Sequence, residues 1–439
     1  MTNTDISPEP ETPTAPPAPQ LRADEAAYEQ AVNDNLKRNY LALLAHGLFG
    51  MTGFRLLNAP TFLPAYIYLL SESDVVVGLI VAAQHIGSSL ASLPGGNMIA
   101  HRKRIVPVFI FIGGMMRLQV LGIALAGLFL PETWTLTATA IFLLFFGMFS
   151  GMQGVSFNYT VSRLVPVKMR GRMMGFRNFM AGIVSAGVAY FGGSYFIDNN
   201  IWGNGYATTF LLAFVLTAIG LIFLLWIREP EPPTVQEQAS FASRLMELPT
   251  LLRQSEGFAR YLVAATLAAL AISAVPFYIL YAGEKQVLTG SYIGALTVAF
   301  MLLQTTSTPA WGYMADHLGN KLVIVISIMI WIAALVLMLT VDTEWVLIVV
   351  FGGVGIGMGG FQIASQNILL EFGDRNSLPM LIATAGMLSS LMFAIGPILA
   401  GFFVAAFSYS ALFTVAIALK VVSLIVTVFF VREPRHANK

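Results

Sequence analysis

Long apolar runs constrain this chain more than any other feature of it. Twelve runs are long enough to cross the hydrocarbon core of a bilayer, which takes about 17–25 helical residues. They lie at residues 40–70, 74–99, 105–130, 134–163, 172–197, 206–227, 258–283, 290–315, 321–341, 345–371, 378–407 and 410–431. Composition agrees, because 11% of the 439 residues are charged, whereas a soluble domain carries about 25% charged residues. The sequence therefore predicts an all-α membrane protein.

The Lys and Arg residues are unevenly distributed between these runs. With the N-terminus taken as cytoplasmic, 20 of the 24 lie on the cytoplasmic side, three lie within runs (Arg55, Arg117 and Lys420), and Lys285 lies outside. By the positive-inside rule, both termini are then cytoplasmic. The first run is too long for the core of a cleavable signal, which has roughly 7–15 residues. We expect an integral protein of a bacterial inner membrane, surrounded by the lipid bilayer.

The longest break between runs, from Arg228 to about Glu256, divides six runs from six. The two halves share phrases in the same order: PAYIYLL (64–70) with PFYILYA (276–282), GNMIAHRKRI (96–105) with GYMADHLGNK (312–321), and WIREP (226–230) with FVREP (430–434). Duplicated bundles of this kind enclose a central path in many secondary transporters. We therefore expect twelve transmembrane helices in two pseudo-symmetric six-helix bundles.

The expected domains follow from this division. They are a disordered N-terminal cytoplasmic tail (1–36), the first bundle (37–228), a cytoplasmic linker with an amphipathic surface helix (229–256), the second bundle (257–434) and a C-terminal tail (435–439).

Three motifs in this order resemble those of the major facilitator superfamily. GYMADHLGNK has that family's loop signature at Gly312, Asp316, Gly319 and Lys321, with His317 where Arg or Lys is usual. PVKMRGRMMG (166–175) resembles the loop between the fourth and fifth helices, and AIGPILAG (394–401) the glycine-proline motif of the eleventh. The resemblance covers about residues 37–434 and implies a twelve-helix transporter. Ala100, in place of the signature's aspartate, and AGVAYFGG (186–193), which lacks proline, argue against a standard multidrug antiporter.

Basic groups lie deep in the runs, whereas Asp and Glu do not. At 1.5 Å of rise per residue, Arg55, His85 and Arg117 all come near the midplane. A buried arginine costs at least about 2.5–3.5 kcal/mol, so one that persists usually has a task. We interpret Arg55 as an anchor for an anionic group, because guanidinium grips carboxylate or phosphate at two points. The alternative is a structural arginine bound to carbonyls at a helix break near Asn58 and Pro60.

Other candidates are polar or titratable. His46 and His85 can carry a proton, although each can equally be a packing residue. Arg117 has two interpretations: it contacts the substrate, or it packs against a neighbouring helix. The sequence identifies no partner for Lys420. The predicted substrate-binding set is Arg55, His85, Arg117, Gln153, Tyr278, Tyr281, Gln304, Gln362 and Gln366.

The resemblance also implies a cytoplasmic gate formed by loops at matching places of the two halves. In one half, Gly312, Asp316 and Gly319 would meet the basic group around Arg170 and Arg172. In the other, the charges would be exchanged, with Arg102 and Arg104 meeting the loop of Glu371 and Asp374. We expect each contact to bias the protein toward closure on this side.

The leading hypothesis is a secondary transporter of a small organic anion, or of an amphipathic molecule with an anionic group. Alternatives are a proton-coupled exporter of drugs or metabolites, and a transporter-like assembly factor or sensor. We expect no enzyme activity, cofactor or metal site, because the chain has no cysteine, P-loop, metal-ligand cluster or nucleophile-His-Asp arrangement. The basic loops are explained by orientation, so we expect no nucleic-acid partner, and we expect a monomer.

Overall fold

A computed structural model describes residues 18–100, 102–231, 256–372, 378–431 and 433, and these are helices joined by short connections. Eleven segments of the described chain are long and apolar enough to span a membrane. The twelfth expected span corresponds to α13 (Gly290–Leu318), which is 29 residues long. It is less apolar than the others because it carries the polar run QTTST at 304–308.

The helices of the first half form one bundle. Their bounds are α1 (Ala18–Asp34), α2 (Leu36–Leu57), α3 (Phe62–Ser71), α4 (Asp74–Ala100), α5 (Val106–Phe129), α6 (Glu132–Leu164), α7 (Val167–Phe191) with the π-helical turn η1 (Gly192–Ile197), η2 (Ile201–Gly203), and α8 (Gly205–Ile222) with η3 (Phe223–Trp226). Within it α4 packs on α6, α2 on α7 and α8, and α5 on α6 and α8.

The N-terminal tail that we expected to be disordered includes a helix, α1. Its residue Tyr28 donates a hydrogen bond to the carbonyl of Arg163 at 3.2 Å.

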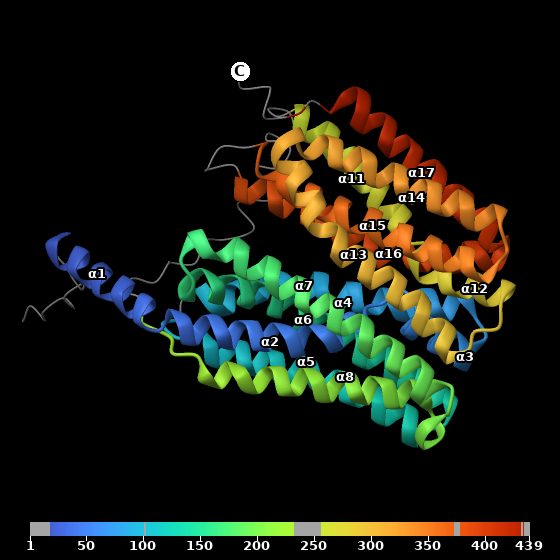
Figure 1. Ribbon diagram of the computed structural model, residues 1–439, viewed down its shortest axis with the longest axis horizontal. Helices are drawn as coiled ribbons and strands as arrows, with labels where there is room; N and C mark the ends of the chain where they lie inside the picture. The colour runs from blue at the N-terminus through green and yellow to red at the C-terminus, as the bar shows by residue number, and fades with distance from the viewer. Residues whose placement is uncertain (1–17, 101, 232–255, 373–377, 432, 434–439) are drawn as a thin grey trace, which may run out of the picture.

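The helices of the second half form the other bundle. They are α11 (Glu256–Ile272), η4 (Val275–Phe277), α12 (Tyr278–Lys285), α13, α14 (Asn320–Thr340), α15 (Glu344–Leu369), α16 (Leu378–Ala406) and α17 (Tyr409–Phe430). The two bundles meet mainly where α4 packs on α16 and α7 on α13. In Figure 1 the blue-to-green helices lie below the yellow-to-red ones. The expected surface helix of the linker lies outside the described residues.

The first and seventh expected spans are each broken, at corresponding places. The run 40–70, expected as one helix, is two helices separated by residues 58–61, and the seventh is divided around residues 273–277. Pro60 and Pro276 lie at these breaks, where proline lacks the amide hydrogen that a continuing helix needs.

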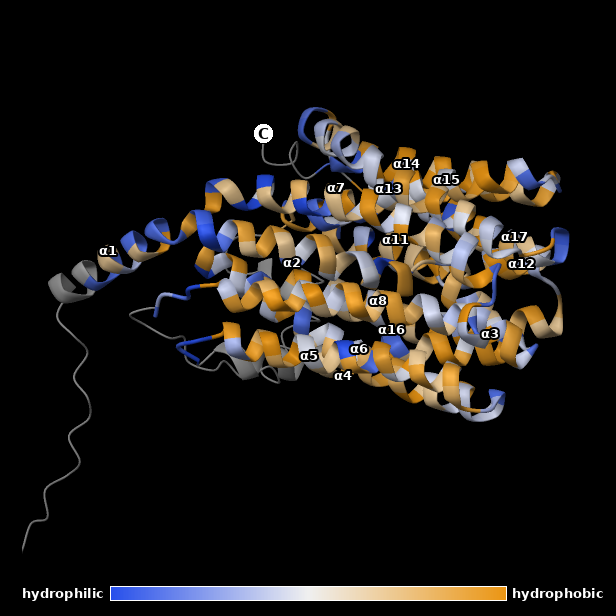
Figure 2. Cartoon of the chain, turned by 60° about the horizontal axis from the view of Figure 1, so that its bottom comes forward, coloured by the Kyte–Doolittle hydropathy of each residue, from blue (hydrophilic) through white to orange (hydrophobic). Residues whose placement is uncertain are grey.

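The outer surface of both bundles is apolar. Large side chains such as Leu90, Phe111 and Val349 are exposed, and Figure 2 shows hydrophobic residues along the lengths of the helices. A surface of this kind is stable against lipid, not water. The protein is therefore an integral membrane protein.

Candidate functional site

A cavity of about 1060 Å³ lies between the two bundles. Its walls come from α2 and α7 of the first bundle and from α13 and α15 of the second. Along α2 the lining extends from Tyr40 to Asn58, which is about 27 Å of helix. We call the end of the molecule where α2 begins and α17 ends the terminal side, and the opposite end the distal side. The cavity reaches from the terminal side to the helix break at residues 58–61.

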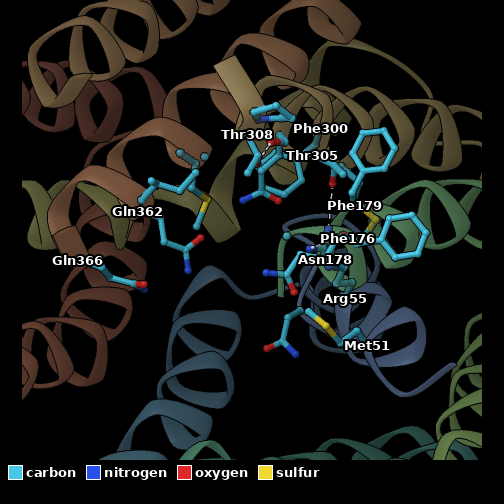
Figure 3. A pocket seen from close by; sticks show the side chains of 18 of the residues that line it. Met51, Arg55, Phe176, Asn178, Phe179, Phe300, Thr305, Thr308, Gln362 and Gln366 are labelled. Atoms are coloured by element: carbon cyan, nitrogen blue, oxygen red, sulfur yellow. Dashed lines mark hydrogen bonds between the residues drawn. The ribbon is translucent and has the colours of Figure 1, made fainter. Parts of the chain in front are cut away.

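Arg55 lies at the deep end of this cavity, in the last turn of α2 (Figure 3). Its Nη1 donates a hydrogen bond to Thr305 Oγ1 on α13 at 3.0 Å, and its Nη2 donates to the carbonyl of Asn178 on α7 at 3.3 Å. Carbonyls of the nearby helix break are not the acceptors of these bonds. The alternative in which the break satisfies Arg55 therefore does not describe this structure.

The rest of the lining divides into an aromatic part and an amide part. Phe176 and Phe179 on α7 and Phe300 on α13 lie on the same side of the cavity as Arg55 (Figure 3). Gln362 and Gln366 lie across the cavity on α15 (Figure 3). Gln304 on α13 also lines the cavity. The cavity thus offers apolar ring faces near its buried cation and hydrogen-bonding groups on the opposite wall.

The charges on the cavity wall have one sign. Among the described lining residues the charged ones are Arg55 and Arg172, and none is Asp or Glu. A low-dielectric cleft lined by one sign of charge concentrates ions of the other sign. The described residues contain no group of His, Cys, Asp and Glu that could hold a metal ion.

The structure does not bring Tyr278 and Tyr281 to this cavity. Both are almost fully buried in the second bundle. The Tyr278 hydroxyl accepts a hydrogen bond from Trp331 Nε1 at 3.2 Å, and both tyrosines pack edge-on against Phe413. The Trp331 ring also supplies the partner that the sequence could not identify for Lys420, whose Nζ lies 3.4 Å from the ring centroid.

Arg117 and His46 are also buried away from the cavity, inside the first bundle. Arg117 Nε donates to the carbonyl of Thr217 at 2.5 Å, and its Nη1 donates to the carbonyl of Gly113 at 2.7 Å. Its Nη2 lies 3.5 Å from His46 Nε2. Of the two interpretations of Arg117, the geometry agrees with helix packing. Gln153 is likewise buried, outside the described lining.

His85 on α4 lies outside the described lining as well. Its ring packs at 5.6 Å from that of Phe393 on α16, where the two bundles meet.

Sequence reasoning missed three residues that the geometry makes important. Asn178 and Thr305 hold Arg55, and no pattern in one sequence indicates which carbonyl or hydroxyl will face an arginine. Arg177 lies in the predicted run 172–197 but was not singled out; α7 begins at Val167 and carries the Arg177 guanidinium inside the bundle, over the Phe157 ring at 4.1 Å. Pro166, directly before α7, was the signal for that earlier helix start.

Three side-chain contacts close the distal side between the bundles. Asp198 Oδ1 accepts from the Gly290 amide at 2.5 Å, and its Oδ2 accepts from the Ser291 amide at 2.9 Å and from the Ser291 hydroxyl. Thr61 Oγ1 lies 2.6 Å from Thr297 Oγ1, and the Tyr409 hydroxyl donates to Asp74. The structure is therefore open on the terminal side and closed on the distal side.

Several predicted gate residues have contacts to the same half of the chain. Arg170 donates to the carbonyls of Val165 and Ser162, and Arg104 pairs with Glu231 at 2.9 Å. Arg163 donates to the carbonyl of Arg102, and Glu371 accepts from Asn320 Nδ2 at 2.9 Å.

Two other gate residues lie near the terminal side. Arg172 lines the cavity, and Asp316 is on the exposed face of α13 near its terminal-side end, between Gly312 and Gly319. Asp374 lies outside the described residues. Contacts of the gate between the bundles stay a prediction.

The glutamates of the repeated REP phrase accept hydrogen bonds from backbone amides at equivalent helix starts in the two bundles. Glu229 accepts from the amides of Ile105 and Val106 at 2.8–2.9 Å, at the start of α5, and lies 3.8 Å from Arg163. Glu433 accepts from the amide of Lys321 at 3.0 Å, at the start of α14. Each glutamate thus caps the third long helix of its own bundle, where the helix dipole also favours an anion.

Comparison with known proteins identifies a family and similar folds. A family model described as "Major Facilitator Superfamily" matches residues 7–190, 47–285 and 261–439. Three solved structures resemble the fold: the nucleoside transporter NupG (TM-score 0.67, 13% identity, 89% of this chain and 98% of that one); a D-xylose-proton symporter (0.67, 16%, 90% and 97%); and the human organic anion transporter MFSD10 (TETRAN) (0.63, 14%, 89% and 99%). No curated protein matched the sequence.

Proposed function

Because this chain belongs to the Major Facilitator Superfamily, and so is a transporter, we propose that its substrate is a small organic anion or an amphipathic molecule with an anionic group. Substrate would bind in the cavity between the bundles, and the bundles would rock about it by alternating access. The observation that carries the proposal is the position of Arg55 at the deep end of a cavity whose described lining has no acidic residue.

The chemistry of the lining supports an amphipathic substrate. An anionic group on Arg55 would gain charge-assisted hydrogen bonds, which are roughly twice as strong as neutral ones. The body of the molecule would lie against Phe176, Phe179 and Phe300, and its polar groups would reach Gln362 on the opposite wall.

We also propose that the terminal side faces the cytoplasm of a bacterial cell. The excess of Lys and Arg in the loops of that side supports this orientation. The structure then corresponds to an inward-facing state. We further propose that the two bundles are the domains 37–228 and 257–434, and that the protein acts as a monomer.

Proton-coupled export has less support from the geometry. His46 and His85 both lie outside the described lining of the cavity, and the buried His46 has the cation Arg117 beside it.

The direct test is uptake into proteoliposomes. Purified protein is first screened for thermal stabilisation by carboxylates and organic phosphates, and labelled forms of the ligands are then offered to the liposomes. We expect Arg55→Gln to reduce uptake tenfold to hundredfold, because a hydrogen bond to a charged group is worth about 1.5–3 kcal/mol. Arg55→Lys should keep part of the activity, since it keeps the charge but loses the planar fork.

Arg260→Gln is the matched control. Arg260 pairs with Glu256 at 2.7 Å on the exposed surface of α11, so its loss should leave uptake unchanged. Full uptake of anions by Arg55→Gln, or a screen in which neutral molecules alone are transported, would contradict the proposal.

A further inference from the structure

Arg55 links the two bundles across the floor of the cavity. Its Nη2 is held by the Asn178 carbonyl of its own bundle, at 3.3 Å, while its Nη1 is held by the Thr305 hydroxyl of the other bundle, at 3.0 Å. Both acceptors are neutral. The guanidinium therefore joins the bundles without having its charge compensated by either of them.

Thr305 is fixed at a close crossing of α7 and α13. It is 4% exposed, and even a methyl group added at Gly182 on α7 would strike its side chain. Its hydroxyl thus has little room to follow Arg55 if the arginine moves. Two turns toward the distal side, the buried contact of Thr61 with Thr297 also joins the bundles, so the Arg55 link lies directly on the terminal side of that closed region.

An anion would compete with Thr305 for the same edge of Arg55. Nη1 and Nη2 carry two hydrogens each, and one of each is donated here. A carboxylate or phosphate binds guanidinium through two parallel hydrogen bonds, and one that forks on the hydrogens now donated displaces Thr305 and Asn178. The charged acceptor is the stronger one. Binding of an anion in this geometry therefore removes the bond between the bundles.

We propose that Thr305 is a positioning residue that ties Arg55 to the second bundle while the cavity is empty, and that a bound anion releases this tie. The proposal rests on the proposed role of Arg55 as the anion anchor. It makes the substrate itself the signal that frees the bundles to rock, with no proton required. The empty carrier is held open on the terminal side, so exchange of one anion for another should be faster than net release.

A test without ligand uses the absence of cysteine from the natural chain. Spin labels are placed at Val167→Cys and Leu370→Cys, two exposed positions at the terminal ends of the two bundles, and their distance distribution is measured in lipid nanodiscs. We expect Thr305→Val to raise the ratio of terminal-closed to terminal-open protein about tenfold. Arg55→Gln should do the same, and the double variant should shift no further.

Thr306→Val is the matched control. Its hydroxyl donates to the carbonyl of Leu302 in its own helix at 2.8 Å, so its removal should leave the distances unchanged. An unchanged distribution in Thr305→Val, or shifts that add in the double variant, would overturn the tie and leave the anchor role of Arg55 standing. Anion uptake that survives Arg55→Gln would instead overturn the proposed function.

Release by an anion is tested with benzoate, whose ring suits the phenylalanines beside Arg55, and with benzamide as its neutral counterpart. Benzoate should shift the labelled protein with native Thr305 and Arg55 in the same direction as Thr305→Val, and benzamide should not. Equal effects of the two compounds, or no effect of benzoate, would overturn the release step.

Discussion

Single carboxylates hold the helix ends of this protein in place. Glu229 is the clearest case, because its side chain is 8% exposed and accepts amide hydrogens from two successive residues of α5. A buried acceptor that serves two donors and a nearby arginine has no substitute in the surrounding structure.

We expect Glu229→Gln to destabilise the protein by about 1.5–3 kcal/mol, because it replaces hydrogen bonds to a charged group and presents an amide N–H₂ to donors. Thermal unfolding in detergent measures the change. Glu231→Gln is the control, since Glu231 pairs with Arg104 on the exposed surface and such pairs contribute about 0–1 kcal/mol. Equal losses in the two variants would contradict the capping role.

At the residue scale, the sequence indicated which charged and polar side chains lie within the membrane spans. It did not indicate the direction in which each side chain points. The embedded cation Arg55 and the glutamines 304, 362 and 366 are brought to one cavity. Arg117 and Tyr278 have the same depth and residue character, but they point into their own bundles. The depth of a residue in the membrane follows from counting residues along an apolar run. Which side of a helix faces the cavity depends on the neighbouring helices, and one sequence does not identify them.

Among the helices, η1, which continues α7, makes a close contact with α13 between the bundles on the distal side. At Gly193 and Gly290 the two backbones lie against each other with no room for a side chain. Glycine allows this approach because it has no Cβ.

We expect Gly193→Val to force the bundles apart on the distal side, because the atoms it would strike belong to backbone that cannot rotate away. A cysteine placed at Thr61, which is buried there, should then react with a maleimide that it otherwise excludes. Gly187→Val in the preceding helix α7, where a Cβ meets nothing within 4 Å, should leave that cysteine protected. Protection in both variants would show that the distal side has other means of closure.

At this scale the positions of the spans were predictable, whereas of the two interruptions the sequence analysis considered only the one near Asn58 and Pro60. Apolar length located the spans, but the run 40–70 reads as continuous because residues 58–61 are flanked by apolar residues on both sides. In α13 the reverse applies, since polar residues of the cavity wall lower its hydropathy although the helix continues to Leu318.

For the molecule as a whole, the contacts of Asp198 act on the balance between open states. Its carboxylate caps the start of α13 from the opposite bundle, and these bonds must break when the distal side opens. A difference of about 1.4 kcal/mol changes the ratio of two states tenfold.

Asp198→Ala should therefore favour the distal-open state by about tenfold or more. Distances between spin labels on the distal ends of the two bundles, measured by double electron–electron resonance, report the ratio of distal-open to distal-closed protein. Asp342→Ala is the control, because Asp342 pairs with Lys285 on the same side but within the second bundle. A distribution that does not change in Asp198→Ala would mean that the cap forms without biasing either state.

The twelve-helix architecture in two bundles was predictable because bilayer thickness and repeated phrases both act over long stretches of sequence. The conformational state was not, since the same chain forms contacts on either side in turn. The gate contact of Asp316 with the basic group around Arg172 therefore stays a prediction for the terminal-closed state.

The charge of Arg55 also has an electrical consequence. Moving one elementary charge across a membrane changes its energy by about 2.3 kcal/mol per 100 mV. With a monovalent anion on Arg55 and no acid in the described cavity wall, the loaded centre is neutral, and membrane voltage acts on the return of the empty carrier. With a divalent anion the loaded centre carries one negative charge while the empty centre still carries the positive charge of Arg55, so both steps depend on voltage. The valence of the cargo thus decides whether the cell's membrane potential acts on one half of the cycle or on both.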